Sequence, residues 1–285
     1  MIRTEALDFP KSILIETYSL CQGECKFCPY PELRGNEEVY VLSNRKYIEL
    51  LGEISKHEIT RLTLFNNNEP LLDKRIYDFT KLAHEMIPNA EIGLSSNGRV
   101  VTLEKLNNLL ESGLTTLYIS IPCIDRENYK QVMGIYPDKI FEVLDSINDE
   151  RLLKMVRIAV PITKYLDEEA MIQRFGKFRI CTWNLEYKDC WGIHDKFTSV
   201  AREDSIAGLC DRPMDQAVIS SNGDVLICCR DWQSQNVVGN VYDDTLYDIW
   251  HSEAMQRIQH LIAQEKYNQV ECCRDCAMSR KAYKR

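Results

Sequence analysis

Short β-rich runs alternate with amphipathic helical segments between residues 11 and 188, and this alternation limits the fold more than any other feature. The first unit is a β-rich run at 12–19 followed by a helix that begins after Ser43. Its apolar residues fall on one helical face: Tyr47, Ile48, Leu51 and Ile54. Further runs and helices follow at 59–65 and 75–87, 90–96 and 102–113, 115–122 and 138–147, 155–163 and 167–175, with a last run at 179–188. Such alternation implies right-handed parallel crossovers, either in a doubly wound sheet or in a partial (β/α)6 barrel.

The pattern changes after about residue 195. Two β runs within 215–229 are joined by Ser-Asn-Gly-Asp, with Asn222 and Gly223 at the turn, which predicts a β-hairpin. One long helix is expected at 245–263, before a cysteine-rich tail. We therefore expect two domains, a barrel at residues 1–195 and a smaller hairpin-plus-helix domain at 196–285.

Charge and cysteine content limit the function. The 285 residues carry a formal net charge of -8. Because neutralising nucleic-acid phosphates needs a basic surface, we expect no nucleic-acid partner. The sequence opens without a charged-then-apolar leader and has no apolar run of about 18 residues, which indicates a soluble, cytoplasmic protein with no membrane partner. In that reducing compartment, twelve cysteines are better explained as metal ligands or reactive thiols than as disulfides.

Three cysteines crowd into a polar loop directly after the first β-rich run. Cys21, Cys25 and Cys28 have a C-x3-C-x2-C spacing. Loops at the carboxyl ends of parallel strands are where such folds carry their chemistry. Three thiolates can hold zinc with a histidine as fourth ligand, or three irons of a four-iron cluster with one iron open. The nearest histidine in the sequence is His57, which favours the cluster.

With Phe27 before its last cysteine, this spacing resembles the signature of the radical S-adenosylmethionine (SAM) superfamily. The resemblance implies a [4Fe-4S] cluster on Cys21, Cys25 and Cys28, whose open iron chelates the amino and carboxylate groups of SAM. An electron from a flavodoxin- or ferredoxin-type donor then leads to a 5′-deoxyadenosyl radical that abstracts hydrogen from a substrate. The cofactor supplies the difficult chemistry, and the protein positions it.

The segment "NNNEPLL", residues 66–72, follows the second β-rich run and looks like a SAM-binding motif of the same superfamily. By this match, Glu69 and the backbone of Asn67 and Asn68 face the SAM ammonium, from which a carboxylate accepts charge-assisted hydrogen bonds. Two asparagines stand where the superfamily usually has glycines. Asparagine adopts positive φ more readily than most residues, so the turn can still form.

The segment "SSNG", residues 95–98, follows the third β-rich run. Alone it is only a turn signal. Placed after a strand and in series with the other two motifs, it is similar to the superfamily's strand-end motif near the SAM ribose. The resemblance implies that Ser95 and Asn97 bind the cofactor, together with Phe27 of the cysteine loop.

Four other cysteines have the spacing of a second metal site: Cys210, Cys228, Cys273 and Cys276. Four thiols could close around one tetrahedral zinc, as in a zinc ribbon, or around one fully ligated cluster. C-x12-G-x4-C followed by a distant C-x2-C resembles the SPASM/twitch extension of radical SAM enzymes, as does the segment 237–258 with its "GN" and "DIWHS". The resemblance implies one auxiliary [4Fe-4S] cluster in a truncated, twitch-type domain.

Five cysteines are left over: Cys123, Cys181, Cys190, Cys229 and Cys272. Motif spacing favours Cys228 over Cys229, and Cys273 over Cys272, as cluster ligands, with both choices left open. A spare thiol at the barrel mouth can return a hydrogen atom to a carbon, which makes Cys229 and Cys190 candidate catalytic residues. By the resemblance, Cys190 stands where related dehydrogenases have a substrate-side arginine.

These features favour an enzyme that abstracts hydrogen from a carbon of a polar substrate. Epimerisation with a cysteine hydrogen donor is placed ahead of two-electron oxidation of an alcohol. The chain resembles radical SAM enzymes of aminoglycoside biosynthesis, which implies a sugar-like or aminocyclitol substrate, and a peptide stays open. The alternative from another class is a non-catalytic scaffold with two zinc sites, which would have no use for the two SAM motifs.

Overall fold

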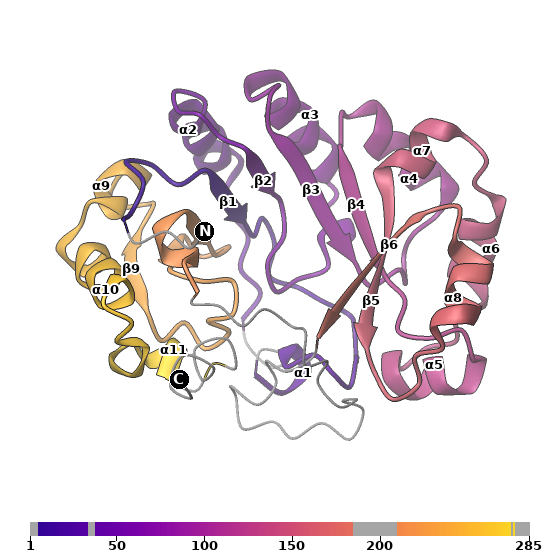
Figure 1. The fold of residues 1–285 in the computed structure, drawn as a ribbon. Helices are drawn as coiled ribbons and strands as arrows, with labels where there is room; N and C mark the ends of the chain where they lie inside the picture. The colour runs from indigo at the N-terminus through magenta and orange to yellow at the C-terminus, as the bar shows by residue number, and fades with distance from the viewer. Residues whose placement is uncertain (1–4, 34–37, 185–209, 275, 277–285) are drawn as a thin grey trace.

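Nine strands form one sheet in the computed structural model of the chain, which describes residues 5–33, 38–184, 210–274 and 276. The strand order is β6-β5-β4-β3-β2-β1-β7-β8-β9. The six parallel strands of the predicted barrel are β1 (Ser12–Ile15), β2 (Arg61–Thr63), β3 (Glu91–Ser96), β4 (Thr116–Ser120), β5 (Val156–Ile162) and β6 (Arg179–Asn184). Their carboxyl ends point the same way, toward the short helix α1 (Tyr30–Leu33) (Figure 1).

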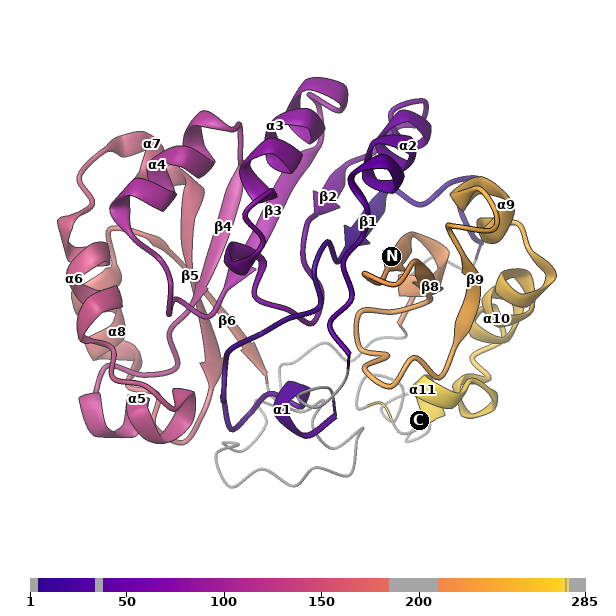
Figure 2. The ribbon, with the colours of Figure 1, turned by 180° about the vertical axis from the view of Figure 1, so that it is seen from behind.

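Helices lie outside these strands, and Figure 2 shows three of them, α2, α3 and α4, on the side of the sheet that faces the viewer. The helices of the barrel are α2 (Asn44–Ile54), α3 (Ile76–Met86), α4 (Leu103–Glu111), α5 (Arg126–Met133), α6 (Asp138–Ser146), α7 (Glu150–Met155) and α8 (Glu168–Phe175). Ser43 begins α2 as predicted, because its side chain accepts the N–H of Lys46. Helices α5 and α7 were not predicted. Each has an aspartate N-cap, Asp125 and Asp149.

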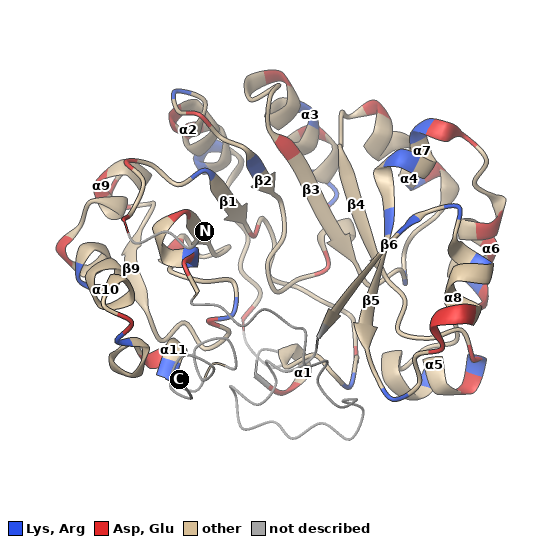
Figure 3. Cartoon of the chain, viewed as in Figure 1, with Lys and Arg blue, Asp and Glu red and all other residues tan. Residues whose placement is uncertain are grey.

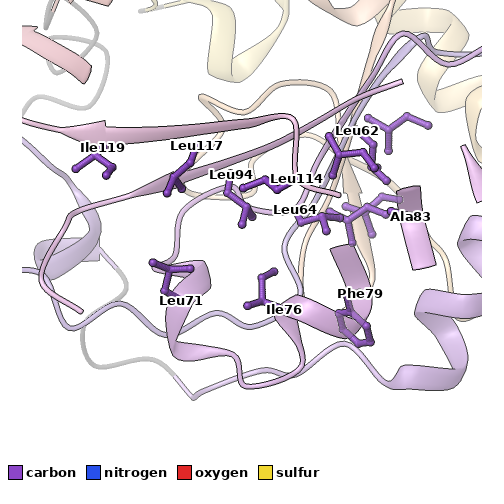
Figure 4. Close-up of a cluster of buried hydrophobic side chains, with 14 of the residues drawn as sticks. Leu62, Leu64, Leu71, Ile76, Phe79, Ala83, Leu94, Leu114, Leu117 and Ile119 are labelled. Atoms are coloured by element: carbon purple, nitrogen blue, oxygen red, sulfur yellow. The ribbon is translucent and has the colours of Figure 1, made fainter. Parts of the chain in front are cut away.

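The main core fills the space between the sheet and its helices. Figure 4 shows part of it, where Leu62, Leu94 and Leu117 of three neighbouring strands face Ile76 and Phe79 of α3. Because side chains alternate along a strand, each strand also presents residues to the opposite face. In β1, Ile13 and Ile15 belong to the main core, whereas Leu14 packs in a separate small cluster with Val218 and Leu226.

The predicted hairpin extends the barrel sheet. Its first strand, β7 (Gln216–Ile219), pairs in parallel with β1, and β8 (Asp224–Leu226) returns antiparallel. At the turn, Gly223 has a φ of 92° and its N–H donates to the carbonyl of Ser220 at 2.8 Å. A further antiparallel strand, β9 (Val237–Asn240), was not predicted, although its segment had been noted. The expected domain boundary at residue 195 lies outside the described residues.

The expected single helix over 245–263 is wrong. The structure has two helices, α9 (Leu246–Trp250) and α10 (Glu253–Ala263), followed by α11 (Glu271–Arg274). Ser252 separates them, because its side chain accepts the N–H of Met255 and begins a new helix. An apolar pattern that continued across the break concealed this cap.

Residues of both charges are interspersed along the outer helices α6, α7 and α8 (Figure 3). The ion pair between Arg174 of α8 and Asp145 of α6, at 2.6 Å, is one example. Within the described ranges, no helix is both long enough and apolar enough to cross a membrane.

Candidate active site

A pocket lies at the carboxyl ends of the parallel strands and contains residues from all three of the first motifs. The nine residues predicted there all line it: Cys21, Cys25, Phe27, Cys28, Asn67, Asn68, Glu69, Ser95 and Asn97. The lining residues that sequence analysis did not single out are Phe65, Asn66, Ser96, Ser120, Met133 and Trp232. The topology thus brings together segments separated by more than two hundred residues.

The cysteine loop is fastened at both ends by hydrogen bonds. The buried Tyr30 hydroxyl accepts the N–H of Cys21 at 2.9 Å and donates to the carbonyl of Ser19 at 3.0 Å. The N–H of Lys26 donates to the carbonyl of Val132 at the end of α5 at 2.8 Å. These bonds hold the loop against the barrel without involving the thiols.

The thiols crowd around Gly23. A Cβ at this position would lie 3.2 Å from Cys21 Sγ, 3.3 Å from Asn97 Nδ2 and 3.5 Å from Cys25 Sγ. Burial first, and then the neighbouring Cys28 and Cys21 thiols, raise the pKa of Cys25. Thiols that resist ionisation in the bare protein need compensating positive charge, and a metal cluster supplies it. The loop therefore fits an iron–sulfur cluster.

Glu69 connects the second motif to the third. One carboxylate oxygen accepts the N–H of Asn97 at 2.7 Å, and the other accepts the N–H of Leu71 at 3.2 Å. The side chain is only 1 % exposed, and burial raises its pKa to about 7 against the lowering effect of these bonds. The N–H of Glu69 donates to the carbonyl of Leu20 at 3.0 Å, next to the cysteine loop. A buried carboxylate in this position is suited to a cationic ligand.

The asparagines of the second motif form their turn without backbone strain, since neither Asn67 nor Asn68 has a positive φ. Asn68 Oδ1 accepts the N–H of Asn66 at 3.1 Å. Among the described residues, Asn68 Nδ2 and Gln22 Nε2 are buried and have no hydrogen-bond partner. Because buried donors are normally satisfied, Asn68 Nδ2, whose residue lines the pocket, fits a ligand with acceptor oxygens there.

The third motif contacts the first directly. Asn97 Nδ2 lies 3.6 Å from Cys21 Sγ, and Asn97 Oδ1 accepts the N–H of Arg99 at 3.0 Å. Gly98 has a φ of 81°, which turns the chain away from the strand end. Ser95 lies on β3, next to this turn, and faces the same pocket.

Glu16 holds the backbone of the second motif in place by a hydrogen bond. Sequence analysis did not identify this residue. It is fully buried directly after β1, and Oε2 accepts the N–H of Asn67 at 2.9 Å. Oε1 accepts the Ser221 hydroxyl at 3.0 Å, so one carboxylate joins the second motif to the β7–β8 turn. An acidic residue that follows an apolar strand run was the signal that could have identified it.

We expect Glu16→Ala to weaken SAM binding about tenfold or more, because a charge-assisted hydrogen bond that orders the Asn67 backbone is lost. Equilibrium dialysis with the reconstituted protein would measure this, and the melting temperature would report any general loss of stability. Ser221→Ala, which removes only the bond to Oε1, is the matched control. An unchanged dissociation constant for Glu16→Ala would mean that the loop needs no such support.

A loop between β8 and β9 connects this pocket with the second set of cysteines. Cys228 lies near the start of the loop, and Trp232 on the same loop lines the first pocket. The buried Asp231 carboxylate accepts the N–H groups of Gln235 at 2.8 Å and Asn236 at 2.7 Å, which fixes the loop's shape. One short segment, from Cys228 to Trp232, therefore runs from the second set of cysteines to the first pocket.

The second set of cysteines also gathers in one place. Burial first, and the neighbouring thiols of Cys273 and Cys276, raise the pKa of Cys210. Cys228 is buried, and the nearby Cys210 thiol contributes to raising the pKa of Cys228. The Cys276 N–H donates to the carbonyl of Cys273 at 3.2 Å, in a turn that directly follows α11. In the described part of the chain, no group of three His, Cys, Asp or Glu side chains is already arranged to hold a single metal ion.

The spare thiols have different surroundings. Cys229 packs against the small cluster of Leu14, Val218 and Leu226, and Cys272 Sγ lies 3.9 Å from Cys273 Sγ. Cys123 is fully buried, and burial raises its pKa to about 12. Cys181 lies on β6 opposite Ala159. Cys190 lies outside the described residues.

A partial β/α barrel with three thiols at its strand ends has the architecture of an iron–sulfur enzyme. The sequence model of the radical SAM superfamily matches residues 15–175, more than half of the chain, and the protein belongs to this superfamily. The model of SPASM, an iron–sulfur cluster-binding domain, matches residues 210–277. The protein is thus a radical SAM enzyme, whose cofactors are SAM and two [4Fe-4S] clusters.

Among characterised proteins, the chain is similar to S-adenosyl-L-methionine-dependent 2-deoxy-scyllo-inosamine dehydrogenase from Niallia circulans, with 22 % identity over 265 residues, which cover 93 % of this chain and 91 % of that protein. It is also similar to GTP 3′,8-cyclase from Mycobacterium marinum, with 26 % identity over 114 residues, 39 % of this chain and 31 % of that protein.

Two solved structures share the fold. The crystal structure of BtrN in complex with AdoMet and 2-DOIA has a TM-score of 0.69 and 21 % identity, and covers 96 % of this chain and 94 % of that one. The crystal structure of Streptococcus suis SuiB bound to precursor peptide SuiA has a TM-score of 0.70 and 17 % identity, and covers 89 % of this chain and 67 % of that one.

Proposed function

We propose that this enzyme oxidises a secondary alcohol of a small polar substrate to a carbonyl, with the second cluster as the electron acceptor. The observation that carries this proposal is the short loop from Cys228 to Trp232, which links the second set of thiols to the SAM pocket. Similarity to a dehydrogenase over nearly the whole chain supports the same choice. The comparisons give no support to epimerisation, which sequence analysis had placed first.

We propose that Cys21, Cys25 and Cys28 hold the first cluster and that Cys210, Cys228, Cys273 and Cys276 hold the second. When bound and reduced, the first cluster supplies the electron that cleaves SAM. The protein's part is to bind and orient: the Glu69 carboxylate accepts hydrogen bonds from the SAM ammonium, and Nδ2 of Asn68 donates to an acceptor oxygen of the ligand. Asn97 and Ser95, beside these groups, are placed near the ribose, and Phe27 closes the pocket next to the thiols.

The overall reaction balances as follows. The carbinol carbon gives up a hydrogen atom to the deoxyadenosyl group, its hydroxyl gives up a proton, and one electron leaves to the second cluster. The products are a carbonyl, 5′-deoxyadenosine, methionine and a proton. One electron enters from an external flavodoxin- or ferredoxin-type donor to cleave SAM, and one electron leaves the substrate. The reaction therefore consumes no electrons overall.

For the substrate we propose an aminocyclitol or a related sugar-like polyol. The support is the relative that acts as a 2-deoxy-scyllo-inosamine dehydrogenase. A peptide is the second candidate, since SuiB shares the fold and has been solved with a precursor peptide. We propose further that residues 1–195 and 196–285 act as the two cluster-bearing domains, and that the enzyme works in the cytoplasm, where a reducing environment preserves its thiols.

The test is incubation of the reconstituted enzyme with SAM, reductant and a panel of aminocyclitols in deuterated water. We expect a product that has lost two hydrogens, formed in step with 5′-deoxyadenosine. A product of unchanged composition that carries solvent deuterium on carbon would instead establish epimerisation, because an exchangeable thiol would be its hydrogen donor. Cys229→Ala and Cys190→Ala, the two candidate donors, would then still cleave SAM but stop forming product.

A further inference from the structure

Two arginines, Arg212 and Arg230, contact the sulfur atoms of the second set of cysteines. Arg212 begins the 3₁₀ helix η3 (Arg212–Met214), and its side chain hydrogen-bonds to Cys228. Arg230 follows Cys228 in the chain. Its backbone N–H donates to Cys228 Sγ at 3.3 Å, and its guanidinium Nη1 lies 4.0 Å from Cys276 Sγ.

The packing around η3 holds Arg212 in this position. Pro213 and Met214 are buried, and Gln259 of α10 donates to the carbonyl of Pro213 at 3.2 Å. An arginine guanidinium stays charged at any physiological pH, and the side chain of Arg212 hydrogen-bonds to Cys228. A fixed charge beside the sulfurs therefore does not depend on a mobile surface side chain.

The surroundings of the first set of cysteines differ. The carboxylate of Glu69 raises the pKa of Cys21, an effect smaller than that of burial, and Arg99 acts in the opposite direction. The first site thus combines one anionic and one cationic neighbour. Close to the second set of cysteines, the Asp231 carboxylate is held by two backbone N–H groups, those of Gln235 and Asn236.

We propose that Arg212 and Arg230 raise the reduction potential of the auxiliary cluster so that it can accept the electron from the oxidised substrate. Reduction adds negative charge to a cluster, and hydrogen bonds to its sulfurs and nearby positive charge stabilise the reduced form. This inference rests on the proposed function, in which the second cluster is an electron acceptor. It assigns a tuning role to two side chains that lie beside the sulfurs of the second set of cysteines.

The test is a potentiometric titration of the full-length, reconstituted protein, followed by electron paramagnetic resonance. The Cys21→Ala, Cys25→Ala, Cys28→Ala triple variant identifies the signal of the auxiliary cluster. For Arg212→Met and Arg230→Met we expect the equilibrium constant for one-electron reduction to fall at least about tenfold, which corresponds to a potential about 59 mV lower. Arg212→Lys keeps the charge and should retain most of the potential. Arg257→Met, on the exposed surface of α10, should not change it.

Iron and sulfide content shows whether each variant keeps its cluster, and Arg230→Met carries the test if Arg212→Met does not. Unchanged potentials in variants with intact clusters would overturn the inference. The two proposals can fail separately. Lowered potentials in an enzyme that oxidises no substrate would remove the proposed function alone, whereas substrate oxidation with unchanged potentials would remove only the role of the arginines.

Discussion

Replacing Cys25 with alanine should lower the formation of 5′-deoxyadenosine from SAM by at least about a thousandfold, the scale on which loss of one member of a catalytic unit acts. Cys25 is the most buried of the first three thiols, and Cys21 and Cys28 lie within its electrostatic reach. Two thiols cannot fix a cluster that leaves only one iron open. The measurement is product formation under anaerobic, reducing conditions, together with iron and sulfide content.

Two matched controls come from the spare thiols. Cys123→Ala removes a thiol packed at the end of β4, and Cys181→Ala removes one on β6, and neither residue lines the pocket. Both variants should cleave SAM at the rate of the unmodified enzyme. Normal SAM cleavage by Cys25→Ala would contradict the assignment of the first cluster to this loop.

The second large effect concerns Glu69 and pH. Burial raises its pKa to about 7 in the protein without ligand, and a cationic ligand needs the ionised form. SAM affinity should therefore be constant above pH 7 and fall about tenfold for each pH unit below it. For Glu69→Gln we expect a SAM affinity about a hundredfold lower than that of the unmodified protein above pH 7. This affinity should not depend on pH over the same range. Equilibrium dialysis from about pH 6 to pH 8 measures both.

The same pKa shift acts on stability in the opposite direction to its effect on SAM affinity: affinity rises with pH, whereas the contribution of Glu69 to stability falls. The folded protein holds the Glu69 proton more tightly than the unfolded chain, in which the pKa has its ordinary value of 4.5. The contribution of this group to the free energy of unfolding is fully present below pH 4.5, falls as pH rises, and is lost above about pH 7. Bound SAM should restore stability above pH 7. Glu91→Gln, at the amino end of β3, is the control that should leave the affinity profile unchanged.

Local sequence signals determined much of the barrel. Hydrophobic periodicity identified each parallel strand within a few residues, and Ser43 marked the first helix start, because both depend on neighbours in the chain. The cysteine spacing and the two strand-end motifs identified the pocket residues for the same reason. Helix α9 was joined wrongly to α10 because an apolar face continued through Ser252.

What the sequence by itself determined, then, was the six parallel strands of the barrel, the hairpin, the cysteine loops and the chemistry that their spacing allows, since each is a local pattern of residue types. Only the tertiary structure decided that β7 pairs with β1, that Glu16 joins Asn67 to the hairpin, and that Trp232 reaches the first pocket. Only the fold placed Arg230 on the sulfur of Cys276. These contacts join segments far apart in the chain, and they arise from how a twisted sheet brings its strand ends together, which no local pattern records.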